Sequence, residues 1–235
     1  MMKSVNLYDD DIGRVDYVQH MGSDLTVVNS ARVSFGARKS SLDDGDKKLI
    51  SYLIRNKHTS TLEHNTITFR FTVPLFVRSQ HHRHRTWSYN EISRRYTDLD
   101  IKFYEPRSFR TQHESNRQAS NVDELCDPLI SYPRDSYAVM PSSYSVKEHN
   151  RISLSLYNRL VEAGVCREQA SGVLPQNMYT EYYGTVNLNN LLKFIGLRAD
   201  SGAQFEIQKV ALACLDIASD VWPITVGIYS DLLDA

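Results

Sequence analysis

The sequence predicts an α+β fold in one domain spanning residues 1–235, with a mixed or antiparallel sheet flanked by helices. Residues 66–73 alternate between apolar and polar side chains, as strands do. Residues 188–195 and 207–221 carry apolar stripes with the 3.6-residue spacing of helices. Strands and helices are interleaved without a regular βαβ repeat, which favours α+β over a parallel α/β sheet.

The first third of the chain begins with a short predicted strand at residues 13–20. Ser23 or Asp24 then caps a helix that runs through Ala31. A second helix is predicted from about Asp46 to Asn56, because leucine and isoleucine residues share one of its faces.

The middle of the chain holds the clearest strand. Residues 57–64 form a polar loop before the strand at 66–73, and Pro74 ends that strand and suits the first turn of a helix. We predict that this helix runs from Leu75 to about Arg85.

A long polar segment follows and then the last helices. Residues 107–143 are aperiodic, so we predict an excursion with at most one short helix, and its length favours a functional loop. The next elements are a helix at 147–163 stopped by Gly164 and a strand at 179–186. The two amphipathic stripes give the final helices, the second ending at Pro223.

Composition excludes several classes of protein. With 27 Lys and Arg against 28 Asp and Glu, the net charge is −1, which excludes a protein that coats nucleic acid through its overall charge. Three scattered cysteines argue against a disulfide framework or a structural zinc site, so we expect a reducing, cytoplasmic setting. No signal peptide or membrane span is recognisable in the sequence.

The most unusual segment, residues 78–96, is rich in Arg, His and aromatic side chains around a single glutamate, Glu91. A metal site is disfavoured, because Arg83 and Arg85 flank His84 and would repel a dication. A nucleic-acid interface is disfavoured by the neutral overall charge. The segment contains no lysine, and the arginine fork suits bidentate contact with phosphate. A small anionic ligand, most simply a nucleotide, is therefore the better hypothesis.

The same segment carries a family signature. Arg83-His84-Arg85 and Ser93 resemble the R-H-R-x7-S motif of flavin-dependent thymidylate synthases, and the longer R-H-R-x-x-S-x-N-E-x-S-x-R-Y form is matched through Tyr96. Further segments resemble the same family, at residues 31–35, 58–64, 173–180 and 197–206. The resemblance covers nearly the whole chain and is weak only at 107–143.

The resemblance implies the reductive methylation of dUMP to dTMP, with 5,10-methylenetetrahydrofolate as carbon donor, NADPH as reductant and FAD as carrier. It also implies a homotetramer with active sites shared between subunits, acting on small molecules rather than nucleic acid or membranes. No cysteine stands in a nucleophile context: Cys126 precedes Asp-Pro, and Cys166 and Cys214 fall in predicted helices, where buried thiols are usual. We therefore expect no cysteine nucleophile. A nucleic-acid-binding module, or a catalytically weak flavin- or nucleotide-binding relative, stays open as an alternative.

Site residues follow from the resemblance. Arg198 is the implied catalytic residue, because a guanidinium beside the uracil favours its N3-deprotonated form. The implied dUMP contacts are Gln80, Arg83, Glu91, Ile92, Ser93, Arg94, Arg95, Ser171 and Arg198. The implied FAD contacts are Ser34, His58, Ser60, Arg83, His84, Arg85, Glu91, Asn187, Asn189 and Lys193, and no metal ligand is implied. If residues 83–85 are helical they fan out by about 100° each, so they face different ligands or subunits.

The chain departs from the family pattern at three positions. Ser171 stands where an arginine that contacts dUMP is common, and Arg167, one helical turn earlier, is a candidate substitute. Asn189 replaces the arginine of N-x-R, and Lys193 stands where Asn or His is usual. Because Asn189 and Lys193 share one helix face, Lys193 is expected to supply the missing charge to the FAD phosphates.

Overall fold

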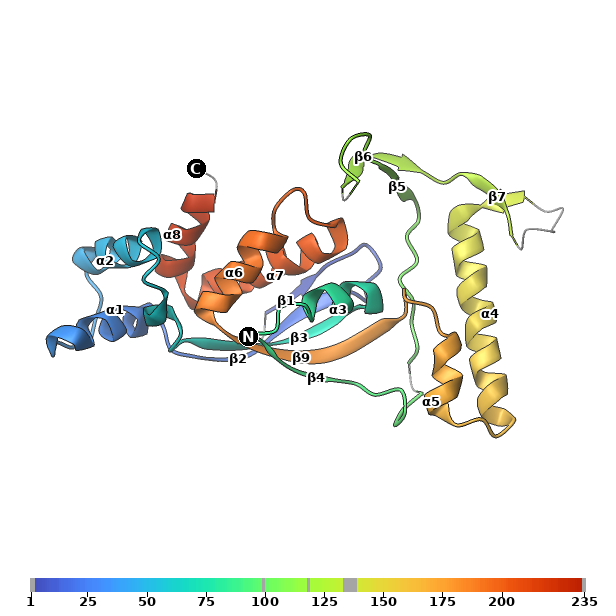
Figure 1. The fold of residues 1–235 in the computed structure, drawn as a ribbon, viewed down its shortest axis with the longest axis horizontal. Helices are drawn as coiled ribbons and strands as arrows, with labels where there is room; N and C mark the ends of the chain where they lie inside the picture. Colours follow the sequence, from blue (N-terminus) through green and yellow to red (C-terminus); the bar gives the residue numbers. More distant parts are fainter. Residues whose placement is uncertain (1–2, 99, 118, 133–138, 234–235) are drawn as a thin grey trace. The chain divides into compact units, whose positions relative to one another are not determined.

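The computed structural model describes residues 3–98, 100–117, 119–132 and 139–233, and confirms the α+β class (Figure 1). The main sheet has the strand order β1-β2-β3-β9-β4. Its strands are β1 (Ser4–Asn6), β2 (Arg14–Met21), β3 (Thr66–Pro74), β9 (Tyr179–Asn187) and β4 (Ser88–Glu91).

The chain forms two compact units. The first comprises Met1–Phe71, Gln80–Asn90 and Tyr182–Ala235, and the second comprises Thr72–Ser79 and Glu91–Glu181. Strands β3, β4 and β9 contain residues of both units. The expectation of one domain over residues 1–235 stays a prediction.

Five helices build the first unit around its strands: α1 (Asp24–Arg32), α2 (Asp44–Arg55), α6 (Leu188–Arg198), α7 (Phe205–Val221) and α8 (Pro223–Leu233). Helix α7 packs against β2, α6 and α8, and α8 also packs against α2 (Figure 1). The stripe predicted at 207–221 is fully buried at Ile207, Val210 and Cys214, because it is the face that α7 turns to the core.

The first helix begins where a capping residue was predicted, since Ser23 is the N-cap of α1. Helix α2 begins at Asp44, two residues before the predicted start, and Asp43 caps it by accepting a hydrogen bond from the Asp46 amide. The predicted loop at 57–64 contains a short 3-10 turn at Thr59–Leu62.

The helix predicted to run to Arg85 is shorter than expected: α3 (Leu75–His81) ends four residues earlier. The amides of Arg83 and His84 donate to the carbonyls of Gln80 and His81, which are turn bonds rather than helical ones. The Tyr89 hydroxyl also donates to the His81 carbonyl at 3.0 Å and so satisfies the end of the helix. The expectation that residues 83–85 point in different directions around a helix was therefore wrong, because these residues lie in a turn.

The second unit contains two hairpins where a loop with at most one helix was predicted. Strands β5 (Phe109–Gln112) and β6 (Ser120–Cys126) pair antiparallel, as do β7 (Leu129–Ser131) and β8 (Val139–Pro141). Most side chains of these strands are at least partly exposed on both faces, so the alternation that identifies a strand is absent from the sequence.

Helices complete the second unit. Helix α4 (Ser142–Glu162) starts five residues before the predicted position, and Gly164 follows it with φ +90°. The short α5 (Arg167–Ala170) comes next. A small core of Tyr157, Ala170, Leu174 and Met178 lies between these helices and the segment leading into β9.

The C-terminal helix was not predicted. Pro223 ends α7 and occupies the first position of α8, where a proline costs no helical hydrogen bond. Buried Asp24 accepts hydrogen bonds from the amides of Ile224 and Thr225 and from the Thr225 hydroxyl, so it caps α8 from another helix.

The cysteines differ in environment. Cys214 is buried, Cys126 is half-buried and Cys166 is exposed. The expectation of a buried thiol at Cys166 was wrong, because this residue is the N-cap of α5 and not an internal helical residue. Across the described ranges, no helix has the length and apolar character needed to cross a bilayer.

Candidate functional site

The first unit holds the turn after α3 against the end of α6. The Nε of Arg198, the last residue of α6, donates to Nε2 of His84 at 3.1 Å. Arg83 precedes His84 in the turn and is exposed, and its positive charge is felt at Arg198. Within the described part of the chain, neither guanidinium contacts a carboxylate. The turn and the helix end therefore form a positive centre with unused donors.

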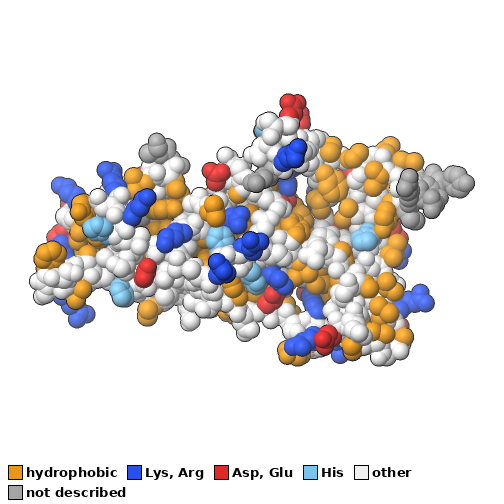
Figure 2. All heavy atoms as spheres, in the orientation of Figure 1, with side chains coloured by type: hydrophobic (Ala, Val, Ile, Leu, Met, Phe, Trp, Pro, Cys, Tyr) orange, Lys and Arg blue, Asp and Glu red, His pale blue; other side chains and the backbone are white. Residues whose placement is uncertain are grey.

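Electrostatics agree with that arrangement. Partial burial, and then the charge of Arg83, lowers the pKa of the Arg198 guanidinium. Burial, and then the charge of Arg198, holds the pKa of His84 below its ordinary 6.5, so His84 is neutral at pH 7. Figure 2 shows Lys, Arg and His side chains gathered on the face around α6. An anion placed here would relieve the repulsion between the two guanidiniums.

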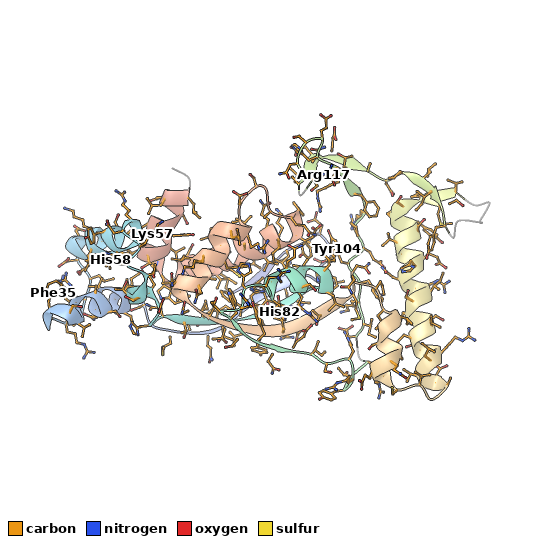
Figure 3. The ribbon with its side chains drawn as sticks, in the orientation of Figure 1. Phe35, Lys57, His58, His82, Tyr104 and Arg117 are labelled. Carbon is orange, nitrogen blue, oxygen red and sulfur yellow. The ribbon has the colours of Figure 1, made fainter. Side chains whose placement is uncertain are left out.

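A cluster of aromatic and histidine rings packs against the turn that follows α3. His81 is completely buried, its Nδ1 lies 2.8 Å from the Tyr182 hydroxyl, and its ring meets Trp87 edge-on at 4.5 Å between centroids. Burial lowers the pKa of His81 well below its ordinary value, so it is a neutral core residue. The His82 ring packs over Tyr89 at 4.0 Å (Figure 3). The turn thus rests on tightly packed rings.

Gln80 is oriented by a relay of side chains. Its Nε2 donates to Oε1 of Gln204, and Nε2 of Gln204 donates to Oε2 of buried Glu206 at 2.9 Å. A carboxylate only accepts hydrogen bonds, so it fixes the direction of both amides. Gln80 keeps its carbonyl oxygen, an acceptor, and its second N–H, a donor, for a ligand.

The start of α6 holds three of the predicted FAD residues. The Asn187 side chain caps the helix by accepting from the Asn190 amide at 2.9 Å. Asn189 is buried and donates to Glu63 at 3.0 Å, which ties α6 to the 3-10 turn of residues 59–62. Lys193 is exposed on the same helix. Of the three, Lys193 exposes its charge, whereas the side chains of Asn187 and Asn189 form hydrogen bonds within the fold.

The remaining FAD candidates of this unit lie toward α1 and α2. Ser34 is exposed in a 3-10 turn (Val33–Phe35) after α1, and His58 and Ser60 are exposed after α2. The His58 ring meets Tyr52 edge-on at 5.6 Å. Figure 3 shows Phe35 and His58 beside α1 and α2, apart from His82. Among the described residues, no hydrogen bond, ion pair or ring contact joins Ser34, His58 or Ser60 to Arg198.

The second unit holds the other half of the motif. Oε1 of Glu91 accepts from Nε of Arg78 at 3.0 Å and from the Thr180 hydroxyl at 2.7 Å. The amide of Ile92 donates to the Glu181 carbonyl at 2.9 Å, which fixes where the motif leaves the sheet.

The turn that follows presents the other predicted nucleotide contacts. The Ser93 hydroxyl accepts from the Arg95 amide at 3.3 Å, and Arg95 is exposed over the Tyr96 ring. Arg94 is half-buried, and burial lowers its pKa. This turn therefore has two cations of different accessibility.

The contacts of Ser171 and Arg167 show whether Arg167 is available to replace the arginine that is common at position 171 in the family. The Ser171 hydroxyl donates to the Glu168 carbonyl at 3.2 Å, which is a local helix-end contact. Arg167 donates from two nitrogens to Asp98 at 3.3 and 2.9 Å. Because Arg167 already has a carboxylate partner, it is a poor substitute for the missing arginine.

Comparison with known proteins decides the family. Residues 16–224 match the family model described as thymidylate synthase complementing protein. Flavin-dependent thymidylate synthases of Thermotoga neapolitana and Thermus thermophilus are 41% and 39% identical to the chain, over 93% and 95% of its length and 91% and 77% of theirs. The chain belongs to the flavin-dependent thymidylate synthase family.

A solved structure supports the same assignment. A UMP/dUMP methylase, PolB from Streptomyces cacaoi, bound with 5-Br dUMP is 30% identical and superposes with a TM-score of 0.77, covering 97% of each chain. The same methylase bound with 5-Br UMP gives a TM-score of 0.75 at 31% identity, covering 92% of this chain and 93% of that one. The chain is an enzyme of the flavin-dependent thymidylate synthase family.

Sequence reasoning on this family member missed several supporting residues. Arg78 and Thr180 hold Glu91, Tyr89 holds the turn, and Gln204 and Glu206 orient Gln80. Arg78 lies in the same arginine-rich stretch, and Gln204 and Glu206 lie in a segment that resembles the family. Thr180 and Gln204 lie 89 and 124 residues from their partners, so only the fold reveals their roles. Among the described residues, no cluster of His, Cys, Asp and Glu is suited to a metal ion.

Proposed function

We propose that the protein converts dUMP to dTMP by reductive methylation, with methylenetetrahydrofolate as carbon donor, NADPH as reductant and FAD as carrier. One observation carries the proposal: Arg198 is held by a neutral histidine beside Arg83, with no carboxylate on either guanidinium in the described part of the chain. Such a pair favours the ionised uracil ring over the neutral one, because the developing negative charge meets two positive ones.

The cysteines support a reaction without a thiol nucleophile. Burial raises the pKa of Cys214, so its thiol is protonated and inert at neutral pH. Cys166 is exposed, and its thiol lies 3.7 Å from Gln169 of its own helix end. Activation of the pyrimidine then falls to Arg198 and its surroundings.

The residues that we propose for the nucleotide come from both halves of the motif. Gln80 offers an acceptor, Arg83 and Arg198 offer positive charge, and Glu91 is held by two partners through a single oxygen. The remaining proposed contacts are the backbone of Ile92 and Arg94 and the side chains of Ser93, Arg95 and Ser171. Ser171 contributes at most a neutral hydroxyl where a charge is common in the family.

The residues proposed for FAD fit a dinucleotide cofactor in charge and accessibility. Arg83, Arg85 and Lys193 are exposed cations, which suit its phosphates, and Ser34, His58 and Ser60 are exposed polar groups. His84 and Glu91 complete the proposed FAD contacts. Asn187 and Asn189 would act through the start of α6, since their side chains already bond within the fold. When bound, FAD supplies the hydride and carries the one-carbon unit.

We propose a homotetramer with shared active sites. In one chain, the segment around His58 lies apart from His82 and the turn after α3 (Figure 3). A single chain would therefore leave the cofactor residues divided between two places. Pairing of subunits brings the two sets together, as closed symmetric assemblies do.

Arg198→Ala tests the proposed reaction. We expect at least about a 100-fold loss of turnover from removing a positioned cationic donor, with FAD content unchanged. Arg198→Lys should recover little, because lysine lacks the fixed fork. Tritium release from C5-labelled dUMP and UMP measures turnover and shows which nucleotide is used. Wild-type protein that remains free of flavin after incubation with FAD would refute the proposal.

A further inference from the structure

The contact between α6 and the turn after α3 gives His84 a second task. Nε of Arg198 donates to Nε2 of His84 at 3.1 Å, and the terminal nitrogens of Arg198 have no other partner among the described residues. We propose that His84 is the positioning residue of Arg198: it fixes Nε of the guanidinium and so aims the two terminal nitrogens at the ligand. This inference rests on the proposed function, in which that ligand is the pyrimidine nucleotide.

His84 is itself held from three directions. Its amide donates to the His81 carbonyl at 2.9 Å, and its own carbonyl accepts from the Tyr89 hydroxyl at 3.1 Å. Its ring meets the Phe194 ring edge-on, at 89° and 4.9 Å between centroids. Phe194 and Arg198 are one helical turn apart on α6, so the ring packs against the same helix that carries the guanidinium it holds. A residue fixed in this way can orient another.

The contact also determines the tautomer of His84. Arginine keeps its Nε hydrogen in every accessible state, so Nε2 of His84 must accept with a lone pair. The ring is therefore neutral, with its proton on Nδ1. A protonated ring would set an N–H against an N–H and place a second cation beside Arg198.

The surroundings favour the neutral ring. His81 and Tyr89 face His84 from the chain around the turn, and Phe194 and Arg198 face it from α6. None of these groups is negatively charged at neutral pH. Burial, followed by the charge of Arg198, lowers the pKa of His84 accordingly.

An imidazole has an advantage over a carboxylate as the holder of Arg198. A carboxylate would orient the guanidinium equally well, but it would neutralise the charge and repel an anionic ligand. A neutral acceptor fixes the geometry and leaves the full positive charge available. His84 thus provides orientation without charge compensation.

The first test requires no nucleotide substrate. The histidines of the flavin-loaded protein are labelled with ¹⁵N, and the His84 signals are assigned by their loss in His84→Gln. We expect the Nδ1–H tautomer in the wild type and a shift toward the commoner Nε2–H tautomer in Arg198→Ala. An Nε2–H tautomer in the wild type would overturn the inference.

The second test follows dUMP binding against pH between 5 and 8, by calorimetry on flavin-loaded protein. In the wild type, protonation of His84 in acid should release Arg198 and lower the affinity further than titration of the dUMP phosphate alone does. His84→Gln places an amide oxygen near the position of Nε2 without a titrating group, so we expect it to bind dUMP and to keep only the decline that the phosphate causes. His84→Phe removes the acceptor and should weaken binding about ten-fold or more. His149→Gln, an exposed histidine of α4, is the control and should keep the wild-type pH profile.

A double-mutant comparison separates positioning from simple structural support. If His84 acts through Arg198, His84→Phe should cause no further loss of dUMP affinity in the Arg198→Ala background. An equal loss in both backgrounds, or an acid decline in His84→Gln as large as that of the wild type, would overturn the inference. Wild-type protein that binds no dUMP at any pH would refute the proposed function instead. The tautomer of His84 would then be the only test of its hydrogen bond with Arg198.

Discussion

The segment that carries Ser34 depends on one buried carboxylate, Asp46. Its two oxygens accept from Arg32 at 2.6 Å, from Lys39 at 2.8 Å and from the Asp43 amide at 3.0 Å. Arg32 and Lys39 lie on either side of the exposed stretch that contains Ser34. Asp46→Asn, which keeps the shape and removes the charge, should therefore loosen both ends of that stretch.

The cost follows from the burial of Asp46. Breaking a buried ion pair by removing one partner typically costs about 3–5 kcal/mol. Asp46 is fully buried, but the side chains of Arg32 and Lys39 are 31% and 29% exposed and stay partly solvated after the change. We therefore expect a loss of about 2–3 kcal/mol, which lowers the melting temperature of a chain of this size by roughly 4–12 °C.

The pH dependence has a definite sign. Burial alone would raise the pKa of Asp46, but hydrogen bonds from Lys39, Arg32 and the Asp43 amide hold it well below the ordinary 3.8. A carboxyl group with a lowered pKa stabilises the fold at pH values above its unfolded pKa and loses that effect as the pH falls. The difference in stability between the wild type and Asp46→Asn should thus be full at pH 7 and shrink below about pH 4.

Differential scanning fluorimetry at pH 7 and at about pH 3 measures the effect. FAD titration at pH 7 shows whether the Ser34 segment serves the cofactor. Asp44→Asn is the matched control, since Asp44 is 93% exposed on the same helix and pairs only with Lys47 among the described residues. We expect no measurable change in its melting temperature. Equal melting temperatures for Asp46→Asn and Asp44→Asn would refute the reasoning.

Three further substitutions test the packing and the relay. Gly184→Ala places a methyl group 2.8 Å from the Phe71 ring and should lower the free energy of unfolding by about 1–3 kcal/mol. The methyl group of Gly227→Ala meets nothing within 4 Å, so this helical substitution should raise the free energy of unfolding by about 1 kcal/mol. Thermal melting of both variants measures the difference, and equal shifts in melting temperature would contradict it. Glu206→Gln removes the charge that fixes the Gln80 amide, so the population that presents its oxygen should fall and dUMP should bind about two-fold more weakly. Calorimetry measures that loss, and tighter binding would contradict the assigned direction of the relay.

The sequence predicted most of the fold where burial leaves a periodic pattern. The alternation at 66–73 and the stripes at 188–195 and 207–221 became β3, α6 and α7, because one face of each is turned to a core. Residues 107–143 lacked such a pattern because their hairpins expose side chains on both faces. The end of α3 was misplaced because the Tyr89 hydroxyl donates to the carbonyl of His81, the last helical residue, and to that of His84 in the turn, and the sequence pattern does not show these contacts.

The candidate site was predictable in its residues and less so in its connections. The resemblance implied roles for Arg83 and His84 in the motif and for Arg198 in the segment at 197–206, and the structure brings these residues together. It did not show that Arg167 is taken by Asp98, since an ion pair between residues so far apart depends on tertiary structure. Ser34 and His58 belong to the predicted set, yet their place beside α1 and α2 separates them from the turn within one chain (Figure 3).

The partners of the arginines distinguish residues that build the fold from residues that serve a ligand. Arg32 and Arg167 each donate to a carboxylate, so their charges are cancelled inside the fold. Arg198 is held by the neutral His84, and Arg83 has no acidic partner among the described residues. Keeping such charges uncompensated costs stability, because like charges repel and burial disfavours them. That cost would be recovered when an anion binds, which is why we place the proposed nucleotide site at the uncompensated pair.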